Sequence, residues 1–334
     1  MLKPLLLACA LAALPNLALA QSGEAAPAYG PRLEGFDYPF EVRQRSFRSQ
    51  GQALEMAYMD LAPGGNANGL TAVLLHGKNF CGATWGDTAK RLQVEGYRVV
   101  VPDQIGFCKS SKPEAYQFSF QQLASNTEEL LDSLGVRKAT VIGHSMGGML
   151  AARYALMFPD RVEKLVLVNP IGLEDWQAKS VPYQTLDDAY AAELKTDFET
   201  IKAYEQRVYY SGKWKPEYGQ WVTMLAGMYK GEGGETVALN QAQTSDMIFT
   251  QPVVQEFRVI KVPTVLMIGQ KDRTAPGGDR APKEIAEKLG DYPKLGRDAA
   301  KAIPNAELIE FPQLGHSPQV EAPAEFQKAL LKAL

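Results

Sequence analysis

The chain has 334 residues, of which 46% are hydrophobic, and its formal net charge is −3. This length supports one large domain with an insertion, or two small domains. The small net charge, without a basic stripe, argues against nucleic acid or an anionic membrane surface as a partner.

The beginning of the chain has the pattern of a secretory signal peptide. Lys3 supplies an early positive charge, a short apolar stretch follows, and small residues at Ala18 and Ala20 precede Gln21. Because the apolar stretch is too short to span a bilayer, we predict that residues 1–20 are removed; an uncleaved N-terminal anchor is the alternative. The mature protein is then expected in the periplasm or outside the cell, without stable membrane insertion.

Short apolar runs bounded by turn residues recur along the rest of the chain. Such runs are typical of strands buried on both faces of a mostly parallel sheet. Residues 40–61 favour one or two antiparallel edge strands, and helical patterns cover residues 120–134 and 148–157. The alternation of strands and helices predicts an α/β doubly wound fold. The expected buried strands cover residues 71–77, 97–103, 139–145, 164–170, 263–269 and 306–311.

Residues 172–257 interrupt this alternation, because they contain helical patterns but no buried-strand pattern. The helical stretches cover residues 186–210, 221–229 and 236–249. A segment of this length between two parts of a regular α/β pattern predicts a helical cap inserted over the sheet. A separate helical domain with no role in substrate access is the alternative. The core domain is then expected from residues 21–171 and 258–334.

The stretch "VIGHSMGGML" places Ser145 in a G-x-S-x-G motif between an expected strand and an expected helix. Glycines at 143 and 147 suit a sharp turn that leaves no room for side chains and lifts the serine hydroxyl above the sheet edge. A serine needs a base within hydrogen-bond reach and an acid that orients the base. Ser145 is therefore the predicted nucleophile.

The chain has three histidines, and His316 is the one that follows the last expected strand. It suits the order serine, acid, histidine along the chain. His76 is expected to form a hydrogen bond with the backbone beneath the site, and the side chain of His144 is expected to point away from the serine. The acid should follow a strand between the serine and the histidine. Asp272 in "VLMIGQKD" is the leading candidate, and Glu174 or Asp175 is the weaker alternative.

An acyl-transfer site also needs N–H donors for the developing oxyanion. The amide of Met146, beside the nucleophile at a helix start, is one candidate. The second is expected from the loop after "LLHG", at Lys78 or else at Asn79.

The segments "LLHGKNFCGATW", "VPDQIGFCKSSKP", "GHSMGG", "GQKDRTAP" and "GHSPQVEAPAEF" together resemble the α/β-hydrolase fold superfamily, in its capped branch of esterases, carbon–carbon bond hydrolases, haloperoxidase-like enzymes and dehalogenases. The resemblance covers residues 40–334. It implies the same roles for Ser145, Asp272 and His316. Dehalogenases and epoxide hydrolases of this branch have an aspartate at the position of Ser145, so their alkyl-enzyme chemistry is not expected here.

The loop "DQIGFCKSS" departs from the family by placing Cys108 where a glycine is common. Cys81 and Cys108 follow strands that should be neighbours, so both loops should emerge at the same sheet edge. In an oxidising compartment we therefore expect a disulfide between them that braces the oxyanion loop. Two small buried thiols are the alternative.

The cap segment is rich in aromatic residues and methionine, which would suit an apolar acyl or alcohol group of a small-molecule substrate. Phe80, Trp85 and Trp176 are the predicted substrate contacts. No H-E-x-x-H, paired C-x-x-C, G-x-G-x-x-G or P-loop motif is present, so neither a metal nor a cofactor is expected.

These residues predict a serine hydrolase that cleaves carboxylic esters or related carbonyl compounds through an acyl-enzyme. Cleavage of a carbon–carbon bond beside a ketone is the alternative among enzymes. A non-catalytic protein that binds a ligand in a hydrolase pocket is the alternative from another class.

Overall fold

The computed structural model describes residues 27–334, so the predicted signal peptide lies outside the described residues. The described chain forms an eight-stranded sheet in the order β1-β2-β4-β3-β5-β6-β7-β8. The β1–β2 and β2–β4 pairs are antiparallel and the other pairs are parallel. The strands are β1 (Val42–Ser49), β2 (Gln52–Leu61), β3 (Thr71–Leu75), β4 (Arg98–Pro102), β5 (Ala139–His144), β6 (Val162–Val168), β7 (Thr264–Gly269) and β8 (Ala306–Phe311). The predicted α/β fold is confirmed.

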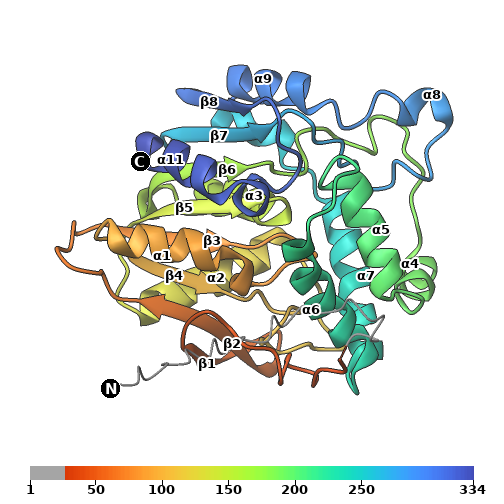
Figure 1. The fold of residues 1–334 in the computed structure, drawn as a ribbon, viewed down its shortest axis with the longest axis horizontal. Coiled ribbons are helices and arrows are strands. Elements are labelled where there is room, and N and C mark those ends of the chain that lie inside the picture. The colour runs from red at the N-terminus through yellow and green to blue at the C-terminus, as the bar shows by residue number, and fades with distance from the viewer. Residues whose placement is uncertain (1–26) are drawn as a thin grey trace, which may run out of the picture.

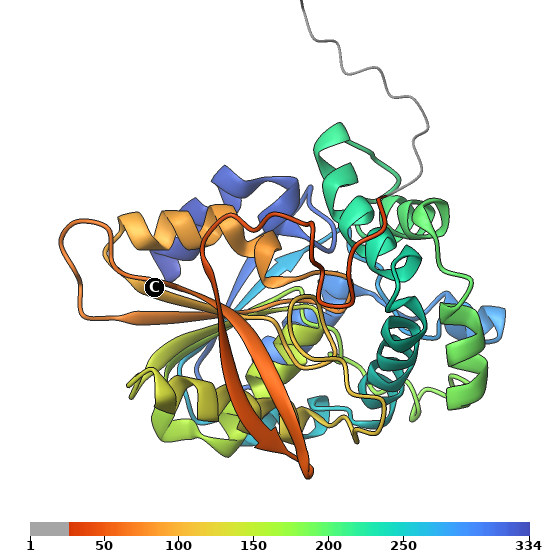
Figure 2. The same cartoon turned by 90° about the horizontal axis from the view of Figure 1, so that it is seen from below.

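Helices cover both faces of the sheet (Figure 2). Successive side chains of a strand point to opposite faces, so Val73 and Leu75 of β3 enter one apolar core while Ala72 and Leu74 enter the other. Both faces of the central strands are therefore buried, which explains their continuous apolar runs. The core with Val73 includes residues of α2 (Phe120–Ser133), α3 (Met146–Met157) and α9 (Tyr292–Ala302); the core with Ala72 includes residues of α1 (Gly86–Val94) and α11 (Pro323–Ala333).

Residues between β6 and β7 form helices that gather at one end of the sheet, at the right of Figure 1. The helices are α4 (Leu186–Glu193), α5 (Phe198–Val208), α6 (Gly219–Lys230) and α7 (Gly234–Thr250). The helical stretch expected over residues 186–210 is divided into two helices, α4 and α5. Asp197 and Thr200 form a capping box that satisfies the free N–H groups of a new helix start, so α5 begins separately from α4.

Short elements complete the described chain. They are α8 (Lys283–Ala286), α10 (Pro318–Glu321) and the 3-10 helices at Gly82–Trp85, Pro159–Arg161, Pro216–Tyr218 and Val254–Val259. Within residues 27–334, every helix is too short or too polar to cross a lipid bilayer.

Candidate active site

Ser145 lies at the turn between β5 and α3, with φ of 56° and ψ of −120°. Two glycines permit this sharp turn. A Cβ atom at Gly143 would lie 2.0 Å from the carbonyl oxygen of Gly147, and one at Gly147 would lie 2.3 Å from the carbonyl oxygen of Leu75. Larger residues would therefore collide with backbone. The strained conformation of Ser145 holds its hydroxyl at the carboxyl end of the sheet.

His316 and Asp272 complete a hydrogen-bonded chain with this serine. The Nε2 atom of His316 lies 2.9 Å from Ser145 Oγ, and its Nδ1 atom lies 2.7 Å from Asp272 Oδ2. Ser145 is 3% exposed and the other two residues are 0% exposed. The structure thus brings together the three residues that the sequence singled out.

Asp272 accepts two further hydrogen bonds. Asn169 Nδ2 donates to Oδ2 at 2.8 Å, and the Thr274 amide donates to Oδ1 at 2.8 Å. A carboxylate only accepts hydrogen bonds, so His316 must donate from Nδ1. Its Nε2 atom is then free to accept the proton of Ser145.

The alternative acids are engaged elsewhere. Glu174 accepts from the Gly290 amide at 2.9 Å and pairs with Lys179 at 2.5 Å. Asp175 accepts from the Ala178 amide at 3.0 Å. Among the described residues, only Asp272 provides a carboxylate to His316.

The other two histidines support the backbone around the site. His144 Nε2 donates to the carbonyl oxygen of His316 at 2.8 Å, and His76 Nε2 accepts from the Gln104 amide at 3.0 Å. Burial lowers the pKa of both imidazoles, and the nearby His316 lowers that of His144 further. Both rings are therefore neutral at neutral pH, and neither one contacts the hydroxyl of Ser145.

Tyr209 and Glu321 fix the loop that carries His316. The Tyr209 carbonyl accepts from the His316 amide at 2.9 Å, and the Tyr209 ring lies over the imidazole with centroids 4.5 Å apart. Glu321 Oε1 accepts from the amides of Gly315 and Ser317 at 2.8 and 3.3 Å. Burial raises the pKa of Glu321 to about 7, so the carboxyl group that holds this loop changes its charge near neutral pH. Neither role was predicted from the sequence.

The candidate oxyanion donors lie on two segments beside Ser145. Met146 is the first residue of α3, so its amide has no acceptor inside the helix. The loop after β3 passes against Ser145, since a Cβ atom at Gly77 would lie 3.0 Å from the Ser145 Cβ. Lys78 follows Gly77 and lines the cavity next to the serine, as does Asn79.

The side chain of Lys78 ties this loop to the cap. Its ammonium group lies 3.0 Å from Glu193 Oε1 at the end of α4, and both side chains are 18% exposed. Tyr229 of α6 donates to the other oxygen of Glu193 at 2.5 Å. The loop and two cap helices are therefore joined through one carboxylate.

A cavity of about 510 Å³ opens onto Ser145 between the sheet and the cap. Its wall is mixed in character. Apolar side chains come from Ile171, Leu225, Ile248 and Phe249, and tyrosines come from positions 183, 204, 209 and 229. Charged groups in the wall are Lys78, Glu193, Asp246, Asp279 and Arg280.

The predicted substrate contacts at Phe80, Trp85 and Trp176 are not found in this wall. Each of the three side chains is 1% exposed and packs inside the protein. Phe80 packs in tilted contacts against the rings of His144 and Tyr209, which suits a supporting position beneath the site. This prediction was wrong because aromatic content does not reveal whether a side chain faces a cavity or the core.

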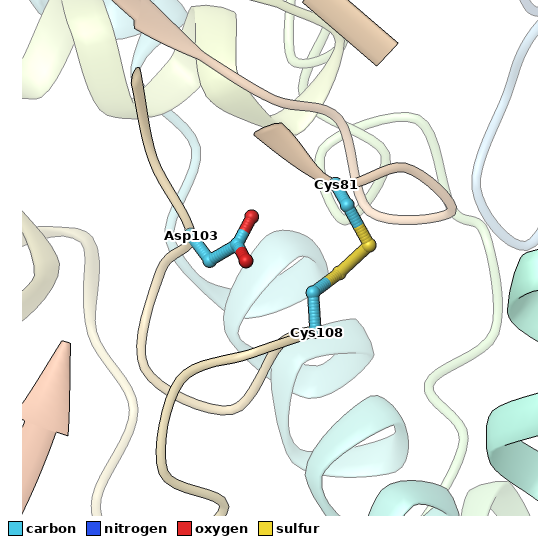
Figure 3. A group of neighbouring side chains, drawn as sticks. All are labelled: Cys81, Asp103 and Cys108. Atoms are coloured by element: carbon cyan, nitrogen blue, oxygen red, sulfur yellow. A yellow bond between two sulfur atoms is a disulfide. The ribbon is translucent and has the colours of Figure 1, made fainter. Parts of the chain in front are cut away.

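Cys81 and Cys108 are joined by a disulfide with Cα atoms 5.9 Å apart, which confirms the expected pairing (Figure 3). Asp103, at the end of β4, accepts from the Gly82 amide at 2.7 Å and the Tyr38 hydroxyl at 2.6 Å. The two sulfurs and the Asp103 carboxylate lie within 4.8 Å of one another. Because both sulfurs are consumed by the disulfide, this cluster offers no thiolate to a metal ion.

Several known proteins are similar to this chain over most of its length. A crystal structure of a probable hydrolytic enzyme from Pseudomonas aeruginosa PAO1 is similar over 92% of this chain and 99% of that one, with 59% identity and a TM-score of 0.91. Lipase 1 of Psychrobacter immobilis is 29% identical over 271 residues, 79% of this chain and 76% of the lipase.

A 2-hydroxy-6-oxo-6-phenylhexa-2,4-dienoate hydrolase of Burkholderia cepacia is 26% identical over 284 residues, 80% of this chain and 88% of that protein. The family model for the alpha/beta hydrolase fold matches residues 71–323, which include Ser145, Asp272 and His316. The mostly parallel sheet and the strained serine turn agree with this match, and the chain belongs to the α/β-hydrolase family.

Proposed function

We propose that this hydrolase is a serine esterase that cleaves carboxylic esters through an acyl-enzyme. Ser145 Oγ attacks the ester carbonyl carbon while His316 Nε2 takes the hydroxyl proton. The carbonyl oxygen becomes negatively charged and accepts hydrogen bonds from the amides of Met146 and Lys78. The tetrahedral intermediate collapses, the bond to the alcohol oxygen breaks, and His316 returns its proton to that oxygen.

Water completes the cycle. His316 takes a proton from a water molecule that attacks the acyl-enzyme, and the carboxylic acid leaves as Ser145 regains its proton. Asp272 stays ionised throughout and stabilises the imidazolium form of His316. Asn169 and the Thr274 amide hold that carboxylate in place, at 2.8 Å each.

One observation carries the proposal, namely the unbroken chain from Ser145 Oγ through His316 to Asp272 at 2.9 and 2.7 Å. These three residues are buried, yet Ser145 also lines the cavity. A ligand-binding protein would have no use for a base on its serine. The lipase relative supports the choice of esters.

The cavity supports a small-molecule substrate with an apolar acyl or alcohol group. Ile171, Leu225, Ile248 and Phe249 offer apolar surface close to Ser145. A volume of about 510 Å³ suits a compact ester, since ligand cavities typically measure several hundred Å³.

We also propose that the protein acts in the periplasm or outside the cell. The signal-peptide pattern at the start of the chain and the Cys81–Cys108 disulfide both suit an oxidising compartment. Fractionation of cells that express the full chain, with N-terminal sequencing of the product, tests this proposal. A product in the cytoplasm that retains Met1 would contradict it.

The activity test is hydrolysis of a panel of p-nitrophenyl esters by the wild type and by Ser145→Ala. We expect turnover by the wild type and loss of at least about a thousandfold in the variant. Ser133→Ala is the matched control, because this serine is exposed at the end of α2 and does not line the cavity. Equal activity of Ser145→Ala and wild type would refute the proposal.

Carbon–carbon bond cleavage beside a ketone is the second candidate, since the Burkholderia cepacia relative is named for such a substrate. The same purified protein is assayed with a 2-hydroxy-6-oxo-dienoate. Turnover of this compound without turnover of any ester would favour the second candidate. Tight binding of either compound without turnover would favour a binding protein.

A further inference from the structure

Arg280 is a cation of the catalytic cavity that the proposed mechanism does not use. It lies between β7 and α8, beyond Asp272 in the chain, and it lines the same cavity as Ser145. The side chain is partly buried. Its position in the wall of the cavity makes it available to a bound substrate.

The guanidinium of Arg280 has no hydrogen-bonding or ionic partner within residues 27–334. No ion pair or hydrogen bond is formed by it, and its Nε atom is buried without an acceptor. Lys78, the other cation of the wall, is already paired with Glu193 at 3.0 Å. A buried donor without an acceptor destabilises the protein, so the geometry favours an acceptor that arrives with a ligand.

Packing holds the guanidinium in one place. Its central carbon lies 6.0 Å from the centroid of the Phe249 ring, within the range of a cation–π contact. A Cβ atom at Gly277 would lie 2.7 Å from Nη2, so the group rests against bare backbone there. Gly277 has φ of 78°, which other residues rarely adopt. The guanidinium is therefore positioned before a ligand binds.

The remaining acids of the wall do not neutralise Arg280 by direct contact. Asp246 accepts from the Tyr183 hydroxyl at 2.9 Å, and Asp279 is exposed at the rim. Together with Glu193 they outnumber the two cations, Lys78 and Arg280, so the wall as a whole does not attract anions. A ligand must therefore reach the guanidinium itself.

We infer that Arg280 binds an anionic group, a carboxylate, on the substrate of this enzyme. A planar guanidinium matches a carboxylate in a two-point contact that a neutral ester group does not provide. This inference rests on the proposed esterase activity and adds the class of substrate: an ester that carries a carboxylate away from the scissile bond, on its acyl or its alcohol side. Arg280 is thus a specificity residue rather than a participant in bond cleavage.

The test compares mono-p-nitrophenyl esters of straight-chain dicarboxylic acids with counterparts whose far carboxylate is a methyl ester. We expect the charged substrate of the best length to have a kcat/KM on the order of tenfold to a hundredfold above its neutral partner. Arg280→Gln should abolish this preference, because it lowers kcat/KM for the charged substrate far more than for its neutral partner, and Arg280→Lys should retain part of it. Acetate esters of hydroxycarboxylic acids, with their methyl esters, test a carboxylate on the alcohol side.

Arg273→Gln is the matched control, because Arg273 lies in the same loop but is 60% exposed and outside the cavity wall. Its variant should keep the preference for the charged substrates. The inference is overturned if wild type hydrolyses charged and neutral esters equally in both the acyl-side and the alcohol-side series, or if Arg280→Gln keeps the preference. The proposed esterase activity would be unaffected by either result. If no ester is hydrolysed at all, the proposed function fails with it.

Discussion

Replacement of Glu205 by Gln should make the protein more stable at alkaline pH. Glu205 lies in cap helix α5, is 0% exposed, and both of its carboxylate oxygens lack a hydrogen-bond partner. Burial therefore favours the protonated form and raises the pKa of Glu205 from 4.5 to about 8. An unfolded chain would ionise the same group at its ordinary pKa.

The sign and size of the effect follow from these two pKa values. Between about pH 4.5 and about pH 8 the unfolded state releases the proton but the folded state retains it, so the stability of the wild type falls as pH rises. A difference of about 3.5 between the pKa values corresponds to a total of roughly 5 kcal/mol. Gln has nearly the same shape and cannot ionise, so the free energy of unfolding of Glu205→Gln does not fall in this way as pH rises.

The assay is urea unfolding of wild type and Glu205→Gln at several pH values between about pH 5 and about pH 9. The free energy of unfolding of the variant minus that of wild type should grow by several kcal/mol from the acidic to the alkaline end of that range, whatever this difference is at acidic pH. Glu199 lies on the exposed side of the same helix, so a plot of unfolding free energy against pH for Glu199→Gln should run parallel to that of wild type. Parallel curves for Glu205→Gln as well would show that the carboxyl is solvated or paired, which would refute the reasoning.

Three further predictions concern the site. Asp272→Asn should lower kcat by on the order of ten-thousandfold, because an amide can hold His316 in the wrong tautomer; a kcat within tenfold of wild type would contradict the role of the acid. Cys81→Ala with Cys108→Ala should lower the free energy of unfolding by roughly 3.5 kcal/mol, from the entropy of the freed loop, and an unchanged urea midpoint would argue against the disulfide. Glu193→Gln should weaken the contact of Lys78 with the cap and raise KM severalfold with little change in kcat; unchanged KM would show that this contact does not order the cavity.

Much of the fold could be predicted from the sequence because local chemistry determines it. Strands buried on both faces need continuous apolar runs, and the expected strand at residues 306–311 coincides with β8. The juxtaposition of Ser145, His316 and Asp272 also followed, since parallel strands deliver the loops after their carboxyl ends to one sheet edge. The catalytic roles of these residues stay predictions.

The cap was less predictable because its helices are placed by long-range packing. Tyr204 and Tyr229 line the cavity, while Trp176 is buried in the core, and no spacing in the sequence distinguishes these positions. Arg280 could not be predicted, because the lack of a hydrogen-bond acceptor for its guanidinium is visible only in three dimensions. Asn169 does have a local sequence signal, because it is a polar residue directly after a buried strand, at the edge where the acid was expected.

The most direct test of the central claim is covalent labelling of Ser145 by diethyl p-nitrophenyl phosphate, followed by intact mass measurement and peptide mapping. We expect a stoichiometric burst of p-nitrophenolate and a diethylphosphoryl group on the peptide that contains Ser145. His316→Ala should label far more slowly because the serine has lost its base. Absence of the adduct on wild type, or an adduct on another residue at the same rate in Ser145→Ala, would contradict the claim that Ser145 is the nucleophile.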